Sequence, residues 1–405
     1  MAVGTQTVIT GSRTSYGTNA NLHVRDVEDK VMLLKPYQTP IEDFFFSDKF
    51  ANEESVGERT KFEWFEDKFL PDSSTITTTG GGTTETDTVG NAYFINFDVI
   101  FIPSTGDRLL VTSGGGTTSI TVKKIGAGNI TATGGAVGCM RLTQAFAENA
   151  AKTSSITVQE VGKSGYCQIQ KRMLSMTGRE QALSQYTGKD WAYQFPKILM
   201  EMKEAMERTW IYNPLAYDEG SGGSGRTYSS GFDGELVTNR ISYSGTLDET
   251  EFDDGMKQIF DGGGSNVREV QCSSGALADI NKFMKQRYSI VNETEIKEYG
   301  VLSTARKRPN VTTYLHPQGL MNICWNPQLK AIGTNTKYAG AILVFDPEKV
   351  KKRYCPPDEK GTRKYRIEKG IETPGDDSYD AQYLFDQGLQ VMHEETQGWF
   401  FQSGT

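Results

Sequence analysis

The chain contains few of the residues that bind metals or form disulfides. Its 405 residues include three histidines and five cysteines. His23, His316 and His393 each lack a second histidine or cysteine close enough in sequence to suggest a metal site. The cysteines are odd in number and widely spaced, which is typical of buried reduced thiols. They are Cys139, Cys167, Cys272, Cys324 and Cys355. We therefore expect no metal ion and no cofactor.

Long apolar runs and an excess of basic charge are also absent. No segment approaches the ~20 apolar residues of a membrane helix, and residues 1–10 lack the basic start and apolar core of a secretory signal. The sequence therefore predicts a soluble chain made in a reducing cytoplasm, without a membrane partner. Its net charge of −8 argues against a protein whose main role is to grip nucleic acid. A container for nucleic acid remains compatible with this charge.

Motifs for catalysis or nucleotide binding are missing as well. Gly162-Lys163-Ser164 ends like a phosphate-binding loop, but position 157 is threonine instead of glycine, and the residues that follow favour a strand. Acidic pairs such as Asp253-Asp254 lie in polar runs that are typical of a solvated surface. We expect neither catalytic residues nor enzymatic activity.

What the sequence does contain is ordered structure in several parts. Its 37% of hydrophobic residues and its length favour two or three units, each with its own core. Residues 1–36 are polar and predict an N-terminal arm that is ordered by its surroundings. Residues 37–72 begin with a short helix at Pro40 and continue into an alternating strand. The side chains on one face of that strand are Phe62, Trp64 and Glu66.

A segment rich in glycine and threonine interrupts this strand and its partner. Short strand candidates at 93–102, 108–112, 119–125 and 141–144 are separated by glycine-rich turns. Residues 73–155 are therefore expected to form a small β-sandwich or barrel, inserted at the tip of a long hairpin. The returning strand of the hairpin is predicted at 156–170.

Helical patterns dominate after the hairpin. We expect a long helix within 171–212, with a kink or break at Gly188 or Pro196. An apolar stripe recurs at helical spacing and should pack in the core of the same subunit; it consists of Trp191, Phe195, Ile198, Met202 and Met206. This helix belongs to a predicted domain at 171–246. An α+β domain is predicted at 247–340, and closing strands at 341–405.

One stretch of the closing segment is unusually basic for an acidic chain. We interpret it as a surface for neighbouring subunits or enclosed DNA, and a solvated hairpin is the alternative. Its basic residues are Lys349, Lys351, Lys352, Arg353, Lys360, Arg363, Lys364, Arg366 and Lys369.

The order of these parts resembles one family. Thr39-Pro40 with its aromatic helix is followed by Lys61-Phe-Glu-Trp-Phe-Glu-Asp67, the β insert, a helix from Gly178-Arg179-Glu180 to Glu207, and Thr373-Pro-Gly-Asp376. Each motif is weak by itself, and the specificity lies in their order. From about residue 37 to 398 the chain resembles tailed-phage major head proteins of the SU10 type, which have the Hong Kong 97 (HK97)-like capsid fold.

The resemblance implies an α+β subunit with an N-terminal arm, an extended loop, a peripheral domain with a long spine helix and an axial domain. It also implies a homo-oligomer of hexameric and pentameric capsomers in the virion capsid, assembled in the host bacterial cytoplasm. Expected partners are scaffold, portal and decoration proteins, and packaged double-stranded DNA bound without sequence specificity.

Other functions remain open from the sequence alone. A tail tube protein, a decoration protein or a nanocompartment shell would also self-assemble. A carbohydrate-binding protein or an enzyme could use the β insert as its module, and exposed aromatics such as Tyr93 or Phe94 would favour sugar binding.

Overall fold

A computed structural model of the protein describes residues 39–45, 53–57, 60–148, 156–183, 190–218, 225–287, 311–332 and 337–403. The predicted N-terminal arm at 1–36, His23 and Gly188 lie outside these ranges. The chain divides into two compact units. One is formed by residues 63–163, and the other by residues 1–62 together with 164–405.

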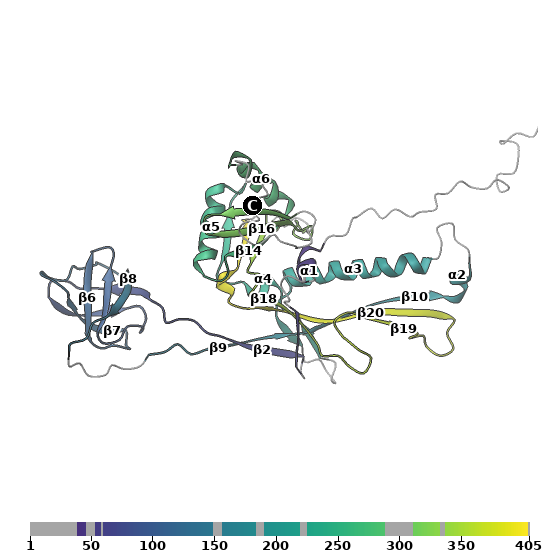
Figure 1. Ribbon diagram of the computed structural model, residues 1–405, viewed down its shortest axis with the longest axis horizontal. Helices are drawn as coiled ribbons and strands as arrows, with labels where there is room; N and C mark the ends of the chain where they lie inside the picture. The colour runs from purple at the N-terminus through teal and green to yellow at the C-terminus, as the bar shows by residue number, and fades with distance from the viewer. Residues whose placement is uncertain are drawn as a thin grey trace, which may run out of the picture. The chain divides into compact units, whose positions relative to one another are not determined.

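The first unit contains a closed barrel of six strands (Figure 1). In barrel order the strands are β3 (Ser73–Thr77), β4 (Thr84–Val89), β7 (Ser119–Lys124), β6 (Asp107–Ser113), β5 (Asp98–Ile102) and β8 (Val137–Gln144). Alternate apolar side chains, such as Ile76, Leu109 and Ile120, fill its interior. The insert is thus a barrel rather than a sandwich. The strand expected from residue 93 begins only at Asp98, because the preceding residues form a turn in which Phe97 has a φ of 73°.

A six-stranded mixed sheet and two helices form one part of the second unit. The sheet order is β13 (Arg240–Tyr243), β21 (Gly398–Gln402), β17 (Ile342–Phe345), β14 (Val267–Cys272), β16 (Gly319–Trp325) and β15 (Val311–His316). The helices are α5 (Glu249–Asp261) and α6 (Ser274–Arg287). Asp248 and Glu251 form a capping box that fixes the start of α5. Phe252 of α5 and Ile280 of α6 pack in one hydrophobic core with side chains of the sheet.

A second sheet is built around one long strand, β20 (Ser378–Val391). β10 (Gln168–Thr177) pairs with one edge of β20 over ten residues. β19 (Arg366–Lys369) pairs with residues 381–384 of β20 on the opposite edge. β18 (Val350–Tyr354) pairs with β20 and, in parallel, with β1 (Glu53–Ser55). A large apolar cluster joins this sheet to α1 (Pro40–Phe45), α3 (Asp190–Tyr212) and α4 (Phe232–Glu235). Figure 1 shows α3 running along β10 and β20.

Shorter elements complete the described residues. β2 (Lys61–Glu66) and β9 (Val161–Tyr166) form a two-stranded ladder, as do β11 (Ala216–Asp218) and β12 (Arg226–Tyr228). α2 (Gly178–Ala182) follows β10, and a 3-10 turn, η2 (Glu394–Thr396), precedes β21. None of the helices in the described ranges combines the length and the apolar character needed to cross a bilayer.

The expectation of helix from residue 171 was wrong at its start. Residues 171–177 belong to β10, because ten consecutive pairs with β20 favour the extended backbone. The long helix α3 has 23 residues, which corresponds to a length of about 35 Å. Pro196 lies within its first two turns.

Candidate functional site

The β2–β9 ladder presents aromatic side chains on two faces. Phe62 is buried and lies within 6 Å of the Arg353 guanidinium. The Trp64 indole donates a hydrogen bond to the Glu66 carboxylate at 2.9 Å. Phe65 and Phe69 are 79% and 100% exposed. The alternation predicted for Phe62, Trp64 and Glu66 therefore leaves the opposite face of β2 with unburied aromatic surface.

The apolar stripe of α3 becomes more buried toward the end of the helix. Trp191, Phe195 and Ile198 are half-buried, whereas Met202 and Met206 lie in the core. The rings of Trp191 and Tyr379 are 4.6 Å apart, and Phe195 stacks on Tyr383 at 4.5 Å. Both tyrosines belong to β20, so the stripe faces the sheet of its own subunit.

A buried ionic cluster beside this stripe was not predicted from the sequence. The Lys352 ammonium lies 2.7 Å from the Glu42 carboxylate, and both side chains are fully buried. Glu42 also accepts hydrogen bonds from the Trp210 indole at 3.0 Å and from the Tyr365 hydroxyl. These residues come from α1, α3, β18 and the segment before β19. One ion pair therefore connects segments from both ends of the described chain.

Glu207 forms the second half of this cluster. Its carboxylate accepts the backbone amides of Ile41 and Glu42, each at 3.0 Å, and the Asn326 side-chain amide at 2.7 Å. Glu207 is not one of the residues of the predicted apolar stripe, yet it is completely buried. Its carboxylate satisfies amides at the start of α1 that have no acceptor within that helix.

The pKa values of the three ionisable groups in this cluster are shifted in different directions. Burial tends to raise the pKa of Glu42, but the charge of Lys352 and three hydrogen bonds outweigh it, so this pKa is lowered. Burial raises the pKa of Glu207 to about 8, because the amides of Ile41 and Glu42 offset only part of the desolvation. Burial lowers the pKa of Lys352 despite the attraction of Glu42. The structure thus favours one ion pair beside one carboxyl that gains a proton easily.

The basic span at 349–369 is largely neutralised within its own subunit. Arg353 contacts Glu54 at 2.6 Å, and Arg363 contacts Asp386 at 2.9 Å. The other ion pairs join Lys351 to Glu54, Lys364 to Glu53, and Arg366 to Asp358 and Glu368. Most acidic partners lie outside the span in sequence, so counting charges within it overestimated the positive surface.

Lys352 is a clear correction to the predicted surface. Its side chain is fully buried against Glu42, so it cannot face a neighbouring subunit or DNA. Arg366 is 9% exposed and is held by Asp358. Lys360 and Lys369 are exposed and Lys349 is half-buried. These three stay closest to the original prediction.

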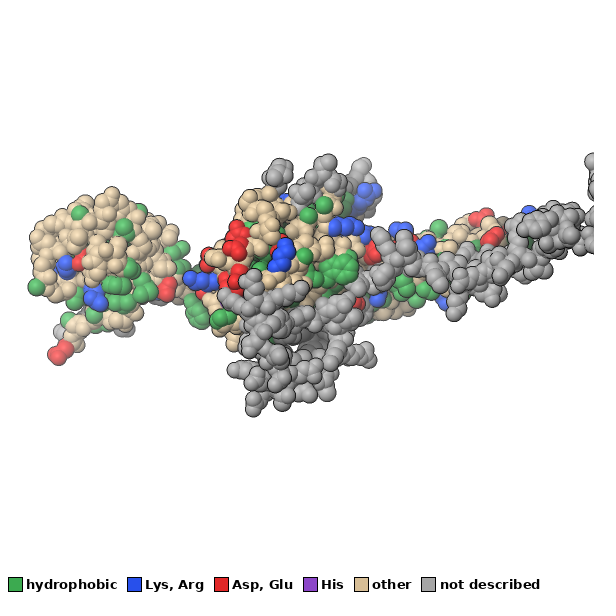
Figure 2. Space-filling model, turned by 90° about the horizontal axis from the view of Figure 1, so that it is seen from above, with side chains coloured by type: hydrophobic (Ala, Val, Ile, Leu, Met, Phe, Trp, Pro, Cys, Tyr) green, Lys and Arg blue, Asp and Glu red, His purple; other side chains and the backbone are tan. Residues whose placement is uncertain are grey.

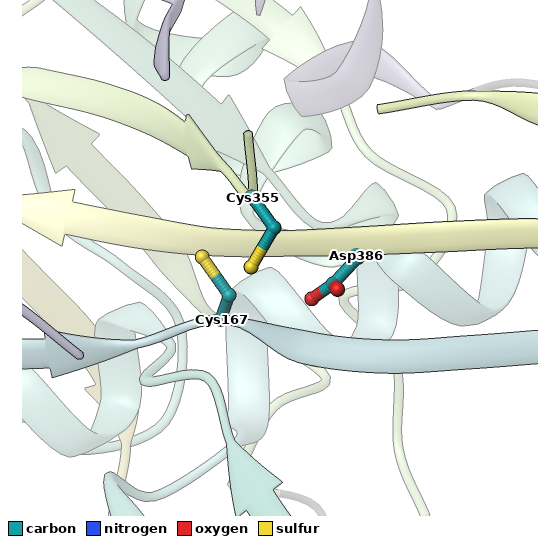
Figure 3. Close-up of side chains that lie close together, drawn as sticks. All are labelled: Cys167, Cys355 and Asp386. Carbon is teal, nitrogen blue, oxygen red and sulfur yellow. The ribbon is translucent and has the colours of Figure 1, made fainter. Parts of the chain in front are cut away.

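Two cysteines and a carboxylate come together at the junction of β10, β18 and β20. Cys167 precedes β10, Cys355 follows β18, and Asp386 lies on β20. Their sulfur and oxygen atoms all lie within 4.8 Å of one another. Figure 3 shows the three side chains close together. All five cysteines are buried free thiols. The hydrogen bond with Cys355, together with burial, raises the pKa of Cys167. Sequence spacing could not reveal this cluster, since its members are far apart in the chain.

The two aromatic residues that would favour sugar binding are not fully exposed on the barrel. Phe94 is 1% exposed and belongs to the barrel core, and Tyr93 is half-buried. Figure 2 shows a barrel face made mostly of uncharged polar side chains, glycine and backbone. Asp87 lies buried on β4, where desolvation and the charge of Glu85 raise its pKa to about 7.

Comparison with known proteins identifies a family for the whole chain. The family model described as SU10 major capsid protein matches residues 8–403. No curated protein matches. Among solved structures, the cyanophage P-SCSP1u capsid is similar at 7% identity and a TM-score of 0.47, over 95% of this chain and 94% of that one. The capsid of the empty GTA particle is similar at 10% identity and a TM-score of 0.47, over 97% of this chain and 98% of that one. The capsid of Myoviridae phage XM1 is similar at 8% identity and a TM-score of 0.45, over 95% of this chain and 98% of that one.

Proposed function

Since this chain belongs to the SU10 major capsid protein family and has a structural, capsid-forming role, we propose that its subunit has the HK97-like fold and builds the icosahedral or prolate head of a tailed phage. The observation that carries this proposal is the family match over residues 8–403. The fold supports it with a long strand pair, a long helix packed on that pair, and a separate α+β sheet.

We assign the parts of the subunit as follows. Residues 37–72 and 156–170 contain the extended loop strands, and the barrel within 73–155 is an elaboration of that loop. The peripheral domain contains α3 and the sheet around β20. The axial domain, at 247–340, contributes α5, α6, β14, β15 and β16, and the closing segment at 341–405 adds β17 and β21 to the same sheet.

The β2–β9 ladder supplies an assembly surface. Phe65, Phe69 and Val161 are all more than half exposed on or beside this ladder. Exposed apolar area is unfavourable by about 25 cal/mol per Å² relative to burial, and such surfaces mark interaction sites. We assign a second copy of this chain as the group that covers them. The role is structural, and we infer no catalytic activity.

The partners follow from this role. The particle encloses double-stranded DNA without sequence specificity, and it assembles in the bacterial cytoplasm with scaffold and portal proteins. Decoration proteins are further candidate partners. Of the basic span, Lys349, Lys360 and Lys369 remain available for contacts between subunits or with DNA, because the other six side chains pair within the subunit.

Electron microscopy of the expressed protein, with and without its scaffold protein, tests the proposal. We expect shells, capsomer-like rings or sheets. A monodisperse monomer at every concentration, even with the scaffold present, would contradict it.

A pair of variants tests the assembly surface. Phe65→Ser combined with Phe69→Ser should give folded subunits that assemble poorly. Val237→Ser is the matched control, because Val237 is 70% exposed but lies outside the ladder. Equal assembly of both variants would remove the ladder from the interface while leaving the capsid role intact.

A further inference from the structure

The cluster of Cys167, Cys355 and Asp386 has the atoms of a metal site. Two sulfurs and a carboxylate oxygen lie within 4.8 Å of one another. In a tetrahedral zinc site, Zn–S distances near 2.3 Å place two sulfurs about 3.8 Å apart. The three side chains are each buried, so they are shielded from competing water. We propose that Cys167, Cys355 and Asp386 bind one zinc ion.

The orientation of Asp386 is the second observation that points to an ion. Arg363 Nε donates a hydrogen bond to Asp386 Oδ2 at 2.9 Å. Asp386 Oδ1 is buried and has no hydrogen-bond partner, in a residue that is 1% exposed. Figure 3 shows the carboxylate directed toward the thiols. A buried oxygen without a donor is unfavourable, and an outer partner that orients a ligating carboxylate is typical of metal sites.

The charges of the site balance when zinc binds. Binding converts two thiols to thiolates and releases two protons to solvent. Zinc, two thiolates and one carboxylate carry a net charge of −1. The Arg363 guanidinium beside Asp386 supplies the compensating positive charge, and the charge of Arg353 acts on Cys167 in the same sense.

Strand register favours an ion over a disulfide between the two cysteines. Gln168 and Tyr354 both pair with Gln387, from opposite sides of β20. Since adjacent strands are about 4.8 Å apart, β10 and β18 are separated by about 10 Å. Disulfides join Cα atoms about 4.4–6.8 Å apart. An ion between the sulfurs spans the larger gap, and would fix the start of β10 to the β18–β20 pair.

Metal analysis of untagged assembled particles tests this site. The particles are produced in cells grown with zinc and are purified without chelators. We expect about one zinc per subunit. Cys167→Ser and Cys355→Ser should each lower zinc occupancy about tenfold or more. Cys272→Ser is the matched control. Cys272 is also a buried thiol and lies near Cys324, but it does not belong to the cluster of Cys167, Cys355 and Asp386. Its zinc content should equal that of the parent.

A measurement on the unaltered chain avoids dependence on variants that fold poorly. Cobalt added to metal-free particles should produce a thiolate-to-cobalt charge-transfer band, and zinc should abolish it. Absence of this band would overturn the proposal. So would parent particles without zinc, equal zinc in Cys167→Ser, or a Cys167–Cys355 disulfide in peptide mass spectra. None of these results would affect the evidence for shell formation.

Discussion

The barrel and the unit that surrounds α3 and β20 are stabilised in different ways. Every strand of the barrel comes from residues 73–144, and its interior combines an apolar core with buried carboxylates such as Asp87 and Asp98. In the other unit, Glu42 and Lys352 are 310 residues apart and form a fully buried ion pair. β1 likewise pairs with β18 across most of the chain.

This difference has consequences for folding. Contacts between residues close in sequence cost little loop-closure entropy, so the barrel can form early and by itself. The larger unit must bring both ends of the chain together before its core is complete. A buried ion pair there adds little net stability, but it penalises any arrangement that leaves one charge unpaired.

Cutting the chain should give the largest contrast. Residues 63–163 expressed alone should fold and melt cooperatively. A chain without residues 1–57 should not fold stably, because it loses Ile41, Phe44 and Phe45 from the main core and leaves Lys352 without Glu42. Circular dichroism melts check both expectations. A stable truncated chain, or an unfolded barrel fragment, would contradict the claim that only the barrel folds from residues close in sequence.

The buried ion pair should give the next largest effect. Glu42→Gln leaves Lys352 charged and buried, which should cost about 3–5 kcal/mol of unfolding free energy. Glu42→Gln combined with Lys352→Met should cost clearly less, because no charge is left unpaired. The matched barrel control is Asp107→Asn, which breaks a less deeply buried pair with Lys124 and should cost less. Denaturant titration measures all three, and equal losses at the two sites would contradict the account.

The contrast also explains what the sequence could reveal. Strands β6 and β7 were predicted because their patterns are local. β3 and β4 escaped prediction because serine, threonine and glycine dominate that stretch. The burial of Glu207 depends on the packing of α3 against α1. The meeting of Cys167 with Cys355 depends on the register of β10 and β18 on β20. Both relations join residues that are far apart in the chain.

The stripe on α3 allows a finer test within the larger unit. Met206 is 2% exposed, so Met206→Ala should cost about 2–5 kcal/mol. Trp191 is half-buried against Phe195 and Tyr379, so Trp191→Ala should cost less despite its larger side chain. Unfolding of the soluble subunit measures both. A folded Trp191→Ala subunit that fails to assemble would identify this end of the stripe as an interface.

The dependence of stability on pH should also distinguish the two units. The pKa of Asp87 is raised from 3.8 to about 7 in the folded barrel. A raised pKa means that the folded state binds the proton more tightly, so barrel stability should fall as pH rises from about 4 to about 7 and then level off. Asp87→Asn should flatten this slope in melts of the barrel fragment. In the larger unit, the raised pKa of Glu207 and the lowered pKa of Glu42 act in opposite directions. An unchanged slope in Asp87→Asn would exclude Asp87 as its source.

A cryo-electron microscopy map of the assembled particle tests the central claim most directly. The account predicts a continuous shell floor made by the unit that contains α3 and β20. Residues 73–144 should appear as a separate closed barrel, outside the floor or bridging capsomers. A map with these residues inside the floor, or with α3 and β20 absent from it, would contradict the account.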